Sequence, residues 1–223
     1  MCYPGRESRI KDPLAEYMED LARPLADACQ RLPGLPMAFF GHSMGASVAY
    51  ETALRLERDH GIGLSALCVS ARGAPGRDRS HKPVPDDDNE LVREILRLGG
   101  TEEAVLLSGE MRQLVLPIVR ADLRLAQRYN AHASLEAISA PLVAYYGLAD
   151  EGLDEQSVNA WAAFTRAHFT LRPMPGGHFY LKDGTAGFVR DLIAQITPPE
   201  FGCGRAVVGA SPVSTAAGPP TLA

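Results

Sequence analysis

The chain has 223 residues, 46% of them hydrophobic, and its 22 basic and 27 acidic residues give a net charge of −5. This length and composition are typical of one globular domain with a sizeable core, and the acidic balance argues against a nucleic-acid-binding protein. The four cysteines lack metal-ligand or C-x-x-C spacing, and no stretch resembles a transmembrane helix or a signal peptide. We therefore expect a cytoplasmic protein with free thiols and without membrane contact.

The first predicted element is a helix that follows Asp12 and Pro13, which resemble an N-cap and a first-turn proline. We expect a kink at Pro24, because proline removes a hydrogen bond from a helix interior. The apolar residues that mark one face of this helix are Leu14, Met18, Leu21, Leu25, Ala28 and Leu32.

A short apolar strand over 37–40 leads into the pentapeptide 41–45, Gly-His-Ser-Met-Gly, and apolar residues at helical spacing follow until Gly61. Glycines two residues before and after a serine are typical of a nucleophile elbow, a tight strand-to-helix turn that exposes the serine hydroxyl above the strand end. We expect a side chain at either glycine to collide with the neighbouring backbone. The pentapeptide alone is a weak signal, but its position between a strand and a helix makes Ser43 a candidate nucleophile.

The next predicted strand covers 64–70, and the alternation of strands and helices then stops between 73 and 130. A polar loop leads there into three predicted helices, whose ranges are 90–98, 102–107 and 110–128. Asp87 and Glu90 have the spacing of a capping box at the start of the first.

A buried strand over 141–146 is followed by Asp150. A carboxylate at the carboxyl end of such a strand projects toward the same rim of the sheet as the serine. Asp150 is therefore the candidate acid of a catalytic triad. Glu151 and Asp154 are nearby competitors, which we interpret as solvated loop charges.

A serine nucleophile needs a base, and in hydrolases built on this elbow the histidine follows the acid in the chain. His178 lies in a Pro-Gly-Gly-His loop after the strand-like run 169–171 and is the better candidate. His168 lies at a helix-to-strand boundary, where we expect an ordinary surface histidine. His42, next to the serine, is expected to pack or to hydrogen-bond locally.

The α/β pattern resumes after the acid, with Trp161 and Phe164 on an inward helical face. The last predicted helix carries Phe188, Leu192 and Ile196. We expect one domain over 1–197, and a disordered tail over 198–223, because that stretch is rich in Pro, Gly, Ala, Ser and Thr and lacks periodicity.

Taken together, these residues resemble the type II thioesterases that accompany modular polyketide and nonribosomal peptide synthetases. The similarity runs from about residue 3 to 197 in the expected order. The stretches that carry it are Tyr-Pro-Gly-Arg-Glu at 3–7, Phe-Phe-Gly-His-Ser-Met-Gly at 39–45, Leu-Gly-Gly-Thr at 98–101, Leu-Pro-Ile-Val-Arg-Ala-Asp at 116–122, Tyr-Gly-Leu-Ala-Asp at 146–150 and Pro-Gly-Gly-His-Phe-Tyr-Leu at 175–181.

The resemblance implies an α/β-hydrolase fold, with Ser43 as nucleophile, Asp150 as acid and His178 as base. It implies hydrolysis of acyl groups from the phosphopantetheine thiol of acyl or peptidyl carrier domains, which releases stalled or misprimed chains. The backbone N–H of Met44 is expected to be one oxyanion-hole donor. The other comes in this family from a loop after a first core strand, upstream of the Tyr-Pro-Gly-Arg segment, and we expect the true start of the protein to lie upstream of Met1.

In such hydrolases the helical insertion, here 73–130, is a lid. The apolar residues that could line an acyl channel beneath it are Leu91, Ile95, Leu98, Leu106, Leu107, Leu114, Val115 and Ile118, although we expect most of them simply to pack the lid onto the body. Arg72, Arg77 and Arg79 could dock an acidic carrier domain, but a solvated charged loop is the favoured interpretation.

Two alternatives remain open. One is an esterase for small soluble esters, which keeps the triad and the lid but has no carrier partner. The other is an inactive, carrier-binding homologue. For either enzyme the expected chemistry is an acyl-serine intermediate that needs no metal ion or organic cofactor.

Overall fold

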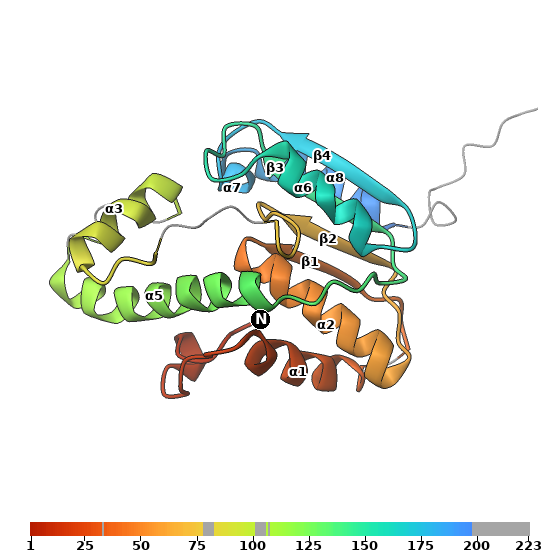
Figure 1. Ribbon diagram of the computed structural model, residues 1–223, viewed down its shortest axis with the longest axis horizontal. Coiled ribbons are helices and arrows are strands. Elements are labelled where there is room, and N and C mark those ends of the chain that lie inside the picture. The colour runs from red at the N-terminus through yellow and green to blue at the C-terminus, as the bar shows by residue number, and fades with distance from the viewer. Residues whose placement is uncertain (33, 78–82, 101–105, 107, 198–223) are drawn as a thin grey trace, which may run out of the picture.

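The structure is a computed structural model that describes residues 1–32, 34–77, 83–100, 106 and 108–197. At the centre of this part lies a sheet of four parallel strands in the order β1-β2-β3-β4 (Figure 1). The strands are β1 (Ala38–His42), β2 (Ala66–Ser70), β3 (Leu142–Gly147) and β4 (Phe169–Met174). Each overlaps a strand predicted from the sequence. All three pairings between neighbouring strands are parallel, which confirms the predicted arrangement.

The burial of the two inner strands explains why their sequences are almost entirely apolar. Every residue of β2 and β3 is buried, as expected for parallel strands that are covered on both faces. Strand β4 continues past its predicted end and includes Pro173, which pairs in register with Tyr146. Proline lacks a backbone donor and is tolerated there because β4 lies at an edge of the sheet.

Helices cover both faces of this sheet. Leu67 of β2 packs with residues of α2 (Met44–His60) in one core cluster, to which α6 (Glu155–Asn159) and η2 (Ala160–Phe164) also contribute. Its neighbour Cys68 points to the opposite face and belongs to a second cluster. That cluster is formed with α7 (Tyr180–Asp183) and α8 (Thr185–Ile196). The inward positions predicted for Trp161 and Phe164 are confirmed, since both are buried, and Phe188 of the last helix is buried as well.

The first long helix is shorter than the sequence predicts. Helix α1 (Met18–Cys29) packs along α2 and has Pro24 in its interior, whereas Asp12 lies outside it and pairs with Arg9 at 2.8 Å. The helix start is instead fixed by Asp20, whose carboxylate accepts the backbone N–H of Tyr17 at 2.9 Å. The predicted N-cap at Asp12 was therefore wrong, because the acid three residues inside the helix performs the capping.

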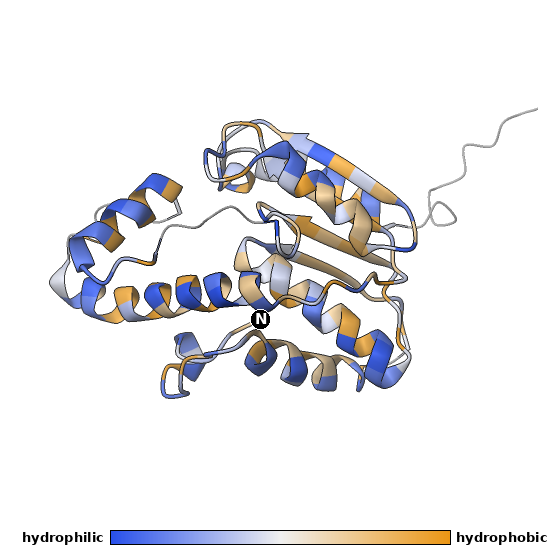
Figure 2. Ribbon diagram, viewed as in Figure 1, coloured by the Kyte–Doolittle hydropathy of each residue, from blue (hydrophilic) through white to orange (hydrophobic). Residues whose placement is uncertain are grey.

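Two helices, α3 (Asp88–Leu98) and α5 (Gly109–His132), lie between β2 and β3 in the chain and extend away from the sheet (Figure 1). We call them the insertion helices. Asp87 accepts hydrogen bonds from the backbone N–H groups of Asn89 and Glu90, which is the Asp87 half of the predicted capping box. Figure 2 shows both helices striped with hydrophilic and hydrophobic residues, as expected for helices with one packed face.

The N-terminal segment ties α5 to the body of the protein. Arg6, next to the short helix η1 (Glu7–Arg9), donates two hydrogen bonds of 2.8 Å to the carboxylate of Asp122 on α5. Both side chains are about one quarter exposed, and such a bidentate pair is among the stronger charged contacts. This contact joins two of the stretches that carry the family resemblance. The predicted helix 102–107 and the predicted tail 198–223 lie, wholly or mostly, outside the described residues.

Candidate active site

The predicted elbow is present between β1 and α2. Ser43 has a φ of 54° and a ψ of −124°, a sparsely populated backbone conformation that costs on the order of 1–3 kcal/mol. It occupies the N-cap position of α2, yet its hydroxyl makes no capping hydrogen bond and remains available for other chemistry. The next residue, Met44, begins α2, so its N–H is one of the first-turn donors that no carbonyl of the same helix can accept.

The two glycines of the elbow differ in the space around their Cβ positions. A Cβ on Gly41 would lie 2.1 Å from the carbonyl oxygen of Gly45, so only glycine fits at that position. A Cβ on Gly45, in contrast, would meet no closer atom outside its own helix than the Tyr3 hydroxyl, at 3.8 Å. The predicted collision is correct for Gly41 and wrong for Gly45, because Gly45 already lies in the first turn of α2 and its Cβ position is open apart from the Tyr3 hydroxyl.

The structure brings Asp150 and His178 together from two different loops. Nδ1 of His178 lies 2.7 Å from Oδ2 of Asp150, and the two side chains are only 14% and 3% exposed. Burial alone raises the pKa of Asp150, but the hydrogen bond and charge of His178, the Gly152 amide and the charge of Arg97 outweigh it, so the pKa lies below its usual value. Asp150 is therefore an ionised partner that orients the imidazole.

Close backbone contact holds the two loops at this distance. A Cβ on Gly147, the last residue of β3, would lie 2.3 Å from the carbonyl oxygen of Gly177 and 2.6 Å from that of Gly176. The amide of Ala149 donates to Gly176 at 2.9 Å. The acid loop and the histidine loop thus touch backbone to backbone, and Gly147 supports the site in a way that no sequence pattern predicted.

We therefore expect Gly147→Ala to push the histidine loop away from Asp150. The added methyl group meets rigid backbone, so overpacking should lower stability by about 1–3 kcal/mol. The displacement of His178 should also slow covalent labelling of Ser43 by a fluorophosphonate. Thermal unfolding and intact mass spectrometry measure the two effects.

Gly187→Ala is the matched control, because a Cβ there would meet nothing within 4 Å. It should leave the labelling rate unchanged and should not lower the stability, since alanine is a better helix former than glycine. Equal labelling rates for the Gly147→Ala and Gly187→Ala variants would contradict the role assigned to this contact.

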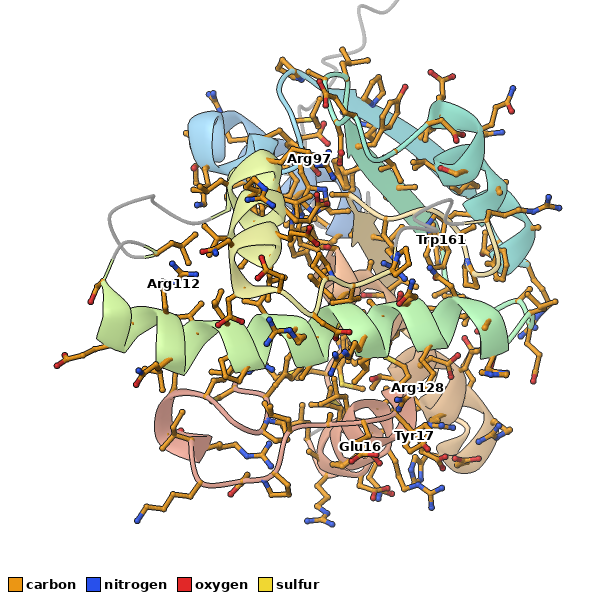
Figure 3. The ribbon with its side chains drawn as sticks, turned by 60° about the vertical axis from the view of Figure 1, so that its left-hand side comes forward. Glu16, Tyr17, Arg97, Arg112, Arg128 and Trp161 are labelled. Atoms are coloured by element: carbon orange, nitrogen blue, oxygen red, sulfur yellow. The ribbon has the colours of Figure 1, made fainter. Side chains whose placement is uncertain are left out.

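Ser43, Asp150 and His178 all line one cavity of about 750 Å³ between the sheet rim and the insertion helices. Among the described residues no hydrogen bond joins the Ser43 hydroxyl to His178, and without bound substrate such contacts are often longer than in the reacting complex. Charged side chains from α3 reach this cavity, including Arg97, which Figure 3 shows at the end of that helix. Arg97 also borders a second cavity of about 440 Å³ beside His178.

The apolar residues predicted to line an acyl channel contribute little to the cavity wall. Leu98 is the single member of the predicted set among the described lining residues, whereas Leu91, Ile95 and Leu106 are buried in a separate cluster with Leu116. Val115 packs against that cluster, Leu114 is exposed, and Leu107 lies outside the described residues. Four of the eight predicted residues therefore pack within the insertion, whereas the favoured prediction had most of them pack the lid onto the body.

A hydrogen-bonded chain lies behind the candidate triad. Nδ1 of His42 lies 2.8 Å from the Ser70 hydroxyl, which in turn lies 2.6 Å from the Tyr180 hydroxyl. Burial and the nearby charge of His178 lower the pKa of His42 to about 4, against the opposing effect of Asp150, so its ring is neutral. His42, predicted to pack or to hydrogen-bond locally, does form a hydrogen bond, although its partner Ser70 lies 28 positions away on β2. No sequence pattern predicted a role for Ser70 or Tyr180, which come from distant segments.

The two competing acids, Glu151 and Asp154, line the same cavity as Ser43, but the hydrogen bond of His178 goes to Asp150. Asp154 caps α6 by accepting the Ser157 amide at 2.7 Å, and Glu151 is exposed. His168 is exposed just before β4. Arg72 does not belong to a solvated loop: it donates to the side chain of Asn130 at 2.7 Å and lines the larger cavity.

The favoured interpretation of a solvated charged loop is therefore wrong for Arg72, and the alternative of a carrier-docking role gains no support there, because the guanidinium is hydrogen-bonded to α5. Arg77 is exposed, and Arg79 lies outside the described residues. In the described part of the chain, no group of three or more His, Cys, Asp or Glu side chains is arranged to hold a metal ion. None of the helices described has both the length and the apolar character needed to span a bilayer.

Comparison with known proteins gives a consistent result. The chain is 40% identical over 184 residues to the thioesterase PikA5 of Streptomyces venezuelae, a match that covers 81% of this chain and 64% of that protein, so the chain spans just under two thirds of its relative. Its fold is similar to that of the type II thioesterase BorB from the borrelidin biosynthetic cluster (TM-score 0.77, 36% identity, 87% of this chain and 79% of that one).

It is also similar to RedJ, a thioesterase of the prodiginine pathway in Streptomyces coelicolor (TM-score 0.78, 33% identity, 88% of this chain and 78% of that one). These likenesses confirm the predicted α/β-hydrolase fold. The sequence pattern of the thioesterase domain family matches residues 1–196. The chain therefore belongs to the thioesterase domain family.

Proposed function

We propose that this protein is a serine thioesterase that hydrolyses acyl groups from the phosphopantetheine thiol of carrier domains. The observation that carries the proposal is the 2.7 Å hydrogen bond between His178 and the buried Asp150, in the same cavity as Ser43 on its strained turn. A hydroxyl, an imidazole and a carboxylate in this relation are what nucleophilic acyl transfer requires.

In the proposed mechanism, the Ser43 oxygen attacks the thioester carbonyl carbon while His178 takes the hydroxyl proton. The Met44 amide, at the positive end of α2, donates to the oxyanion that forms. The carbon–sulfur bond then breaks, and the thiolate receives its proton from the imidazolium, which Asp150 stabilises. In the deacylation step, His178 takes a proton from water, and the hydroxide attacks the carbonyl carbon of the acyl-serine. The bond to the Ser43 oxygen then breaks, the carboxylic acid product is released, and the proton returns from His178 to Ser43.

The proposed partners are acyl or peptidyl carrier domains of polyketide or nonribosomal peptide synthetases. This part of the proposal is supported by two similar proteins of such pathways, YbtT from the yersiniabactin NRPS/PKS pathway (26% identity) and ClbQ from the colibactin NRPS/PKS pathway (30% identity). We further propose that the insertion helices α3 and α5 are the lid over the acyl group, since both contribute residues to the wall of the cavity that contains Ser43.

The test compares an acyl-pantetheine thioester with an oxygen ester of the same acyl group, each enzymatic rate divided by the rate of spontaneous hydrolysis. We expect the thioester to be preferred by at least about tenfold in kcat/KM, a difference of about 1.4 kcal/mol in transition-state binding. The same acyl group on a carrier domain should raise kcat/KM further, because the protein partner adds contacts.

A preference for the oxygen ester would contradict the proposal and favour a small-ester esterase. Equal rates on the free and the carrier-bound thioester would contradict the assigned partner. Loss of all activity together with loss of Ser43 labelling, in a folded sample, would favour an inactive homologue.

A further inference from the structure

Phe179, the residue after the candidate base, contacts side chains of the candidate active site and not those of the apolar core. Its ring centroid lies 5.0 Å from that of His178, in an edge-on arrangement, and 5.3 Å from that of His42. The ammonium of Lys182 lies 5.3 Å from the same ring. Phe179 belongs to none of the apolar core clusters of the described residues, whereas the next residue, Tyr180, does.

The end of α3 rests on this ring. A Cβ on Gly100 would lie 2.4 Å from the Phe179 ring, which is closer than any real contact. The Lys182 ammonium also donates a 2.6 Å hydrogen bond to the Gly100 carbonyl. An insertion helix and the histidine loop are thus joined at one point, directly beside His178 and along the wall of the smaller cavity.

The two glycines at this point have different reasons to be glycine. Gly99 ends α3 in the left-handed conformation, with a φ of 77° and open space around its Cβ position. Gly100 has no such backbone requirement, and its Cβ position is blocked by the Phe179 ring alone among its closest neighbours. The absence of a side chain at Gly100 therefore serves the approach of Phe179 and not a turn.

We propose that Phe179 is a positioning residue for His178, and that the absence of a side chain at Gly100 allows the Phe179 ring to occupy its place. The Asp150 hydrogen bond fixes Nδ1 of the imidazole but still allows the ring to rock about that bond. His42, 5.2 Å from His178 on one side, and Phe179 on another restrict this motion. Because Gly100 follows directly after α3, the orientation of the base depends on how the insertion helices pack against the histidine loop. The proposal rests on the proposed function, since it concerns the base of that reaction.

The test is Gly100→Ala, which adds one methyl group against the Phe179 ring. Because small misplacements of a catalytic group are costly, we expect kcat to fall by about 10- to 100-fold while KM stays within about twofold. The matched control is Gly109→Ala in α5, another glycine of the insertion, where an added Cβ meets nothing within 4 Å and the backbone is already helical. It should leave kcat and KM unchanged.

A second variant separates positioning from a general loss of structure. Phe179→Leu removes the flat ring and should itself lower kcat. In that background Gly100→Ala should add less than a twofold loss, because the obstacle to the methyl group is gone. Independent, multiplicative losses in the double variant would overturn the proposal, as would a Gly100→Ala variant with the kcat of the parent or a Gly109→Ala variant that is equally slow.

Ser43 labelling by a fluorophosphonate keeps this proposal separate from the proposed function. The labelling rate depends on His178 but not on a thioester or a carrier. If the parent labels but hydrolyses no thioester, the proposed function fails, and the labelling rates of the four variants still test the role of Phe179. Slow labelling of Gly100→Ala beside normal labelling of Gly109→Ala would support it, and equal rates would overturn it.

Discussion

Substitution of Ser43 by alanine should abolish both thioester hydrolysis and fluorophosphonate labelling. The hydroxyl is the nucleophile in the proposed mechanism, and no other described serine occupies a turn of this kind. Loss of a serine nucleophile in comparable hydrolases lowers kcat on the order of 10⁶-fold. Intact mass spectrometry should show one added phosphonyl group on the parent and none on Ser43→Ala.

The stability of the Ser43→Ala variant should stay close to that of the parent, because the hydroxyl makes no capping bond to α2. Ser47→Ala is the matched control: Ser47 lies one helical turn further along α2 and is buried. It should keep full labelling. Labelling that persists in Ser43→Ala would identify a different nucleophile and contradict the proposed mechanism.

The strands and the elbow could be predicted from the sequence because their determinants are local. Strands β2 and β3 are continuous apolar runs, and Gly41 precedes a serine at the spacing that a strand-to-helix turn requires. Asp150 and His178 could be proposed in turn, because the carboxyl ends of parallel strands meet at one rim. The order of the strands in the chain then placed both side chains near Ser43.

The supporting residues could not be predicted in this way, because each depends on a contact between distant segments. Gly147 is needed only because the histidine loop lies against it, and Gly100 only because Phe179 does. Neither of these close contacts leaves a periodic signal in the sequence. Ser70 and Tyr180 likewise meet across 110 positions of the chain.

The insertion helices illustrate the same limit. Their apolar periodicity predicted α3 and α5 well, but periodicity alone does not say which partner an apolar face will meet. Leu91, Ile95 and Leu106 could have faced substrate, yet they pack on Leu116, and the cavity received charged side chains from α3 instead. The start of α1 was misplaced for a similar reason, since both Asp12 and Asp20 have the character of a helix-terminal acid and only the folded chain shows which one caps.

Asp150→Asn isolates the role of the acid. The asparagine amide has nearly the same shape as the carboxylate but carries no charge to stabilise the imidazolium. It can also present an N–H to Nδ1 of His178 and so favour the wrong tautomer. We expect kcat to fall by about 10⁴-fold, the effect of this substitution in a serine hydrolase triad, with little change in KM. Steady-state kinetics on an acyl-pantetheine thioester measures it.

The same substitution should remove a pH dependence of stability. The pKa of Asp150 is lowered in the folded protein, so its ionised form stabilises the fold above the unfolded-state pKa of about 3.9, and this contribution is lost as the pH falls through the folded-state pKa. The stability of the parent should therefore decline more steeply than that of Asp150→Asn at the acidic end of a titration followed by urea unfolding.

The two carboxylates that compete with Asp150 in the sequence supply the controls for its catalytic role. Glu151→Gln changes an exposed side chain one residue away and should keep kcat within about threefold of the parent, as most surface substitutions cost little. Asp154→Asn keeps a good N-cap for α6, because asparagine accepts the same backbone hydrogen bond. A 10⁴-fold loss confined to Asp150→Asn would distinguish the partner of His178 from its neighbours. A comparable loss in Glu151→Gln, or near-normal turnover in Asp150→Asn, would contradict the assignment and show that the 2.7 Å contact does not act in the reaction.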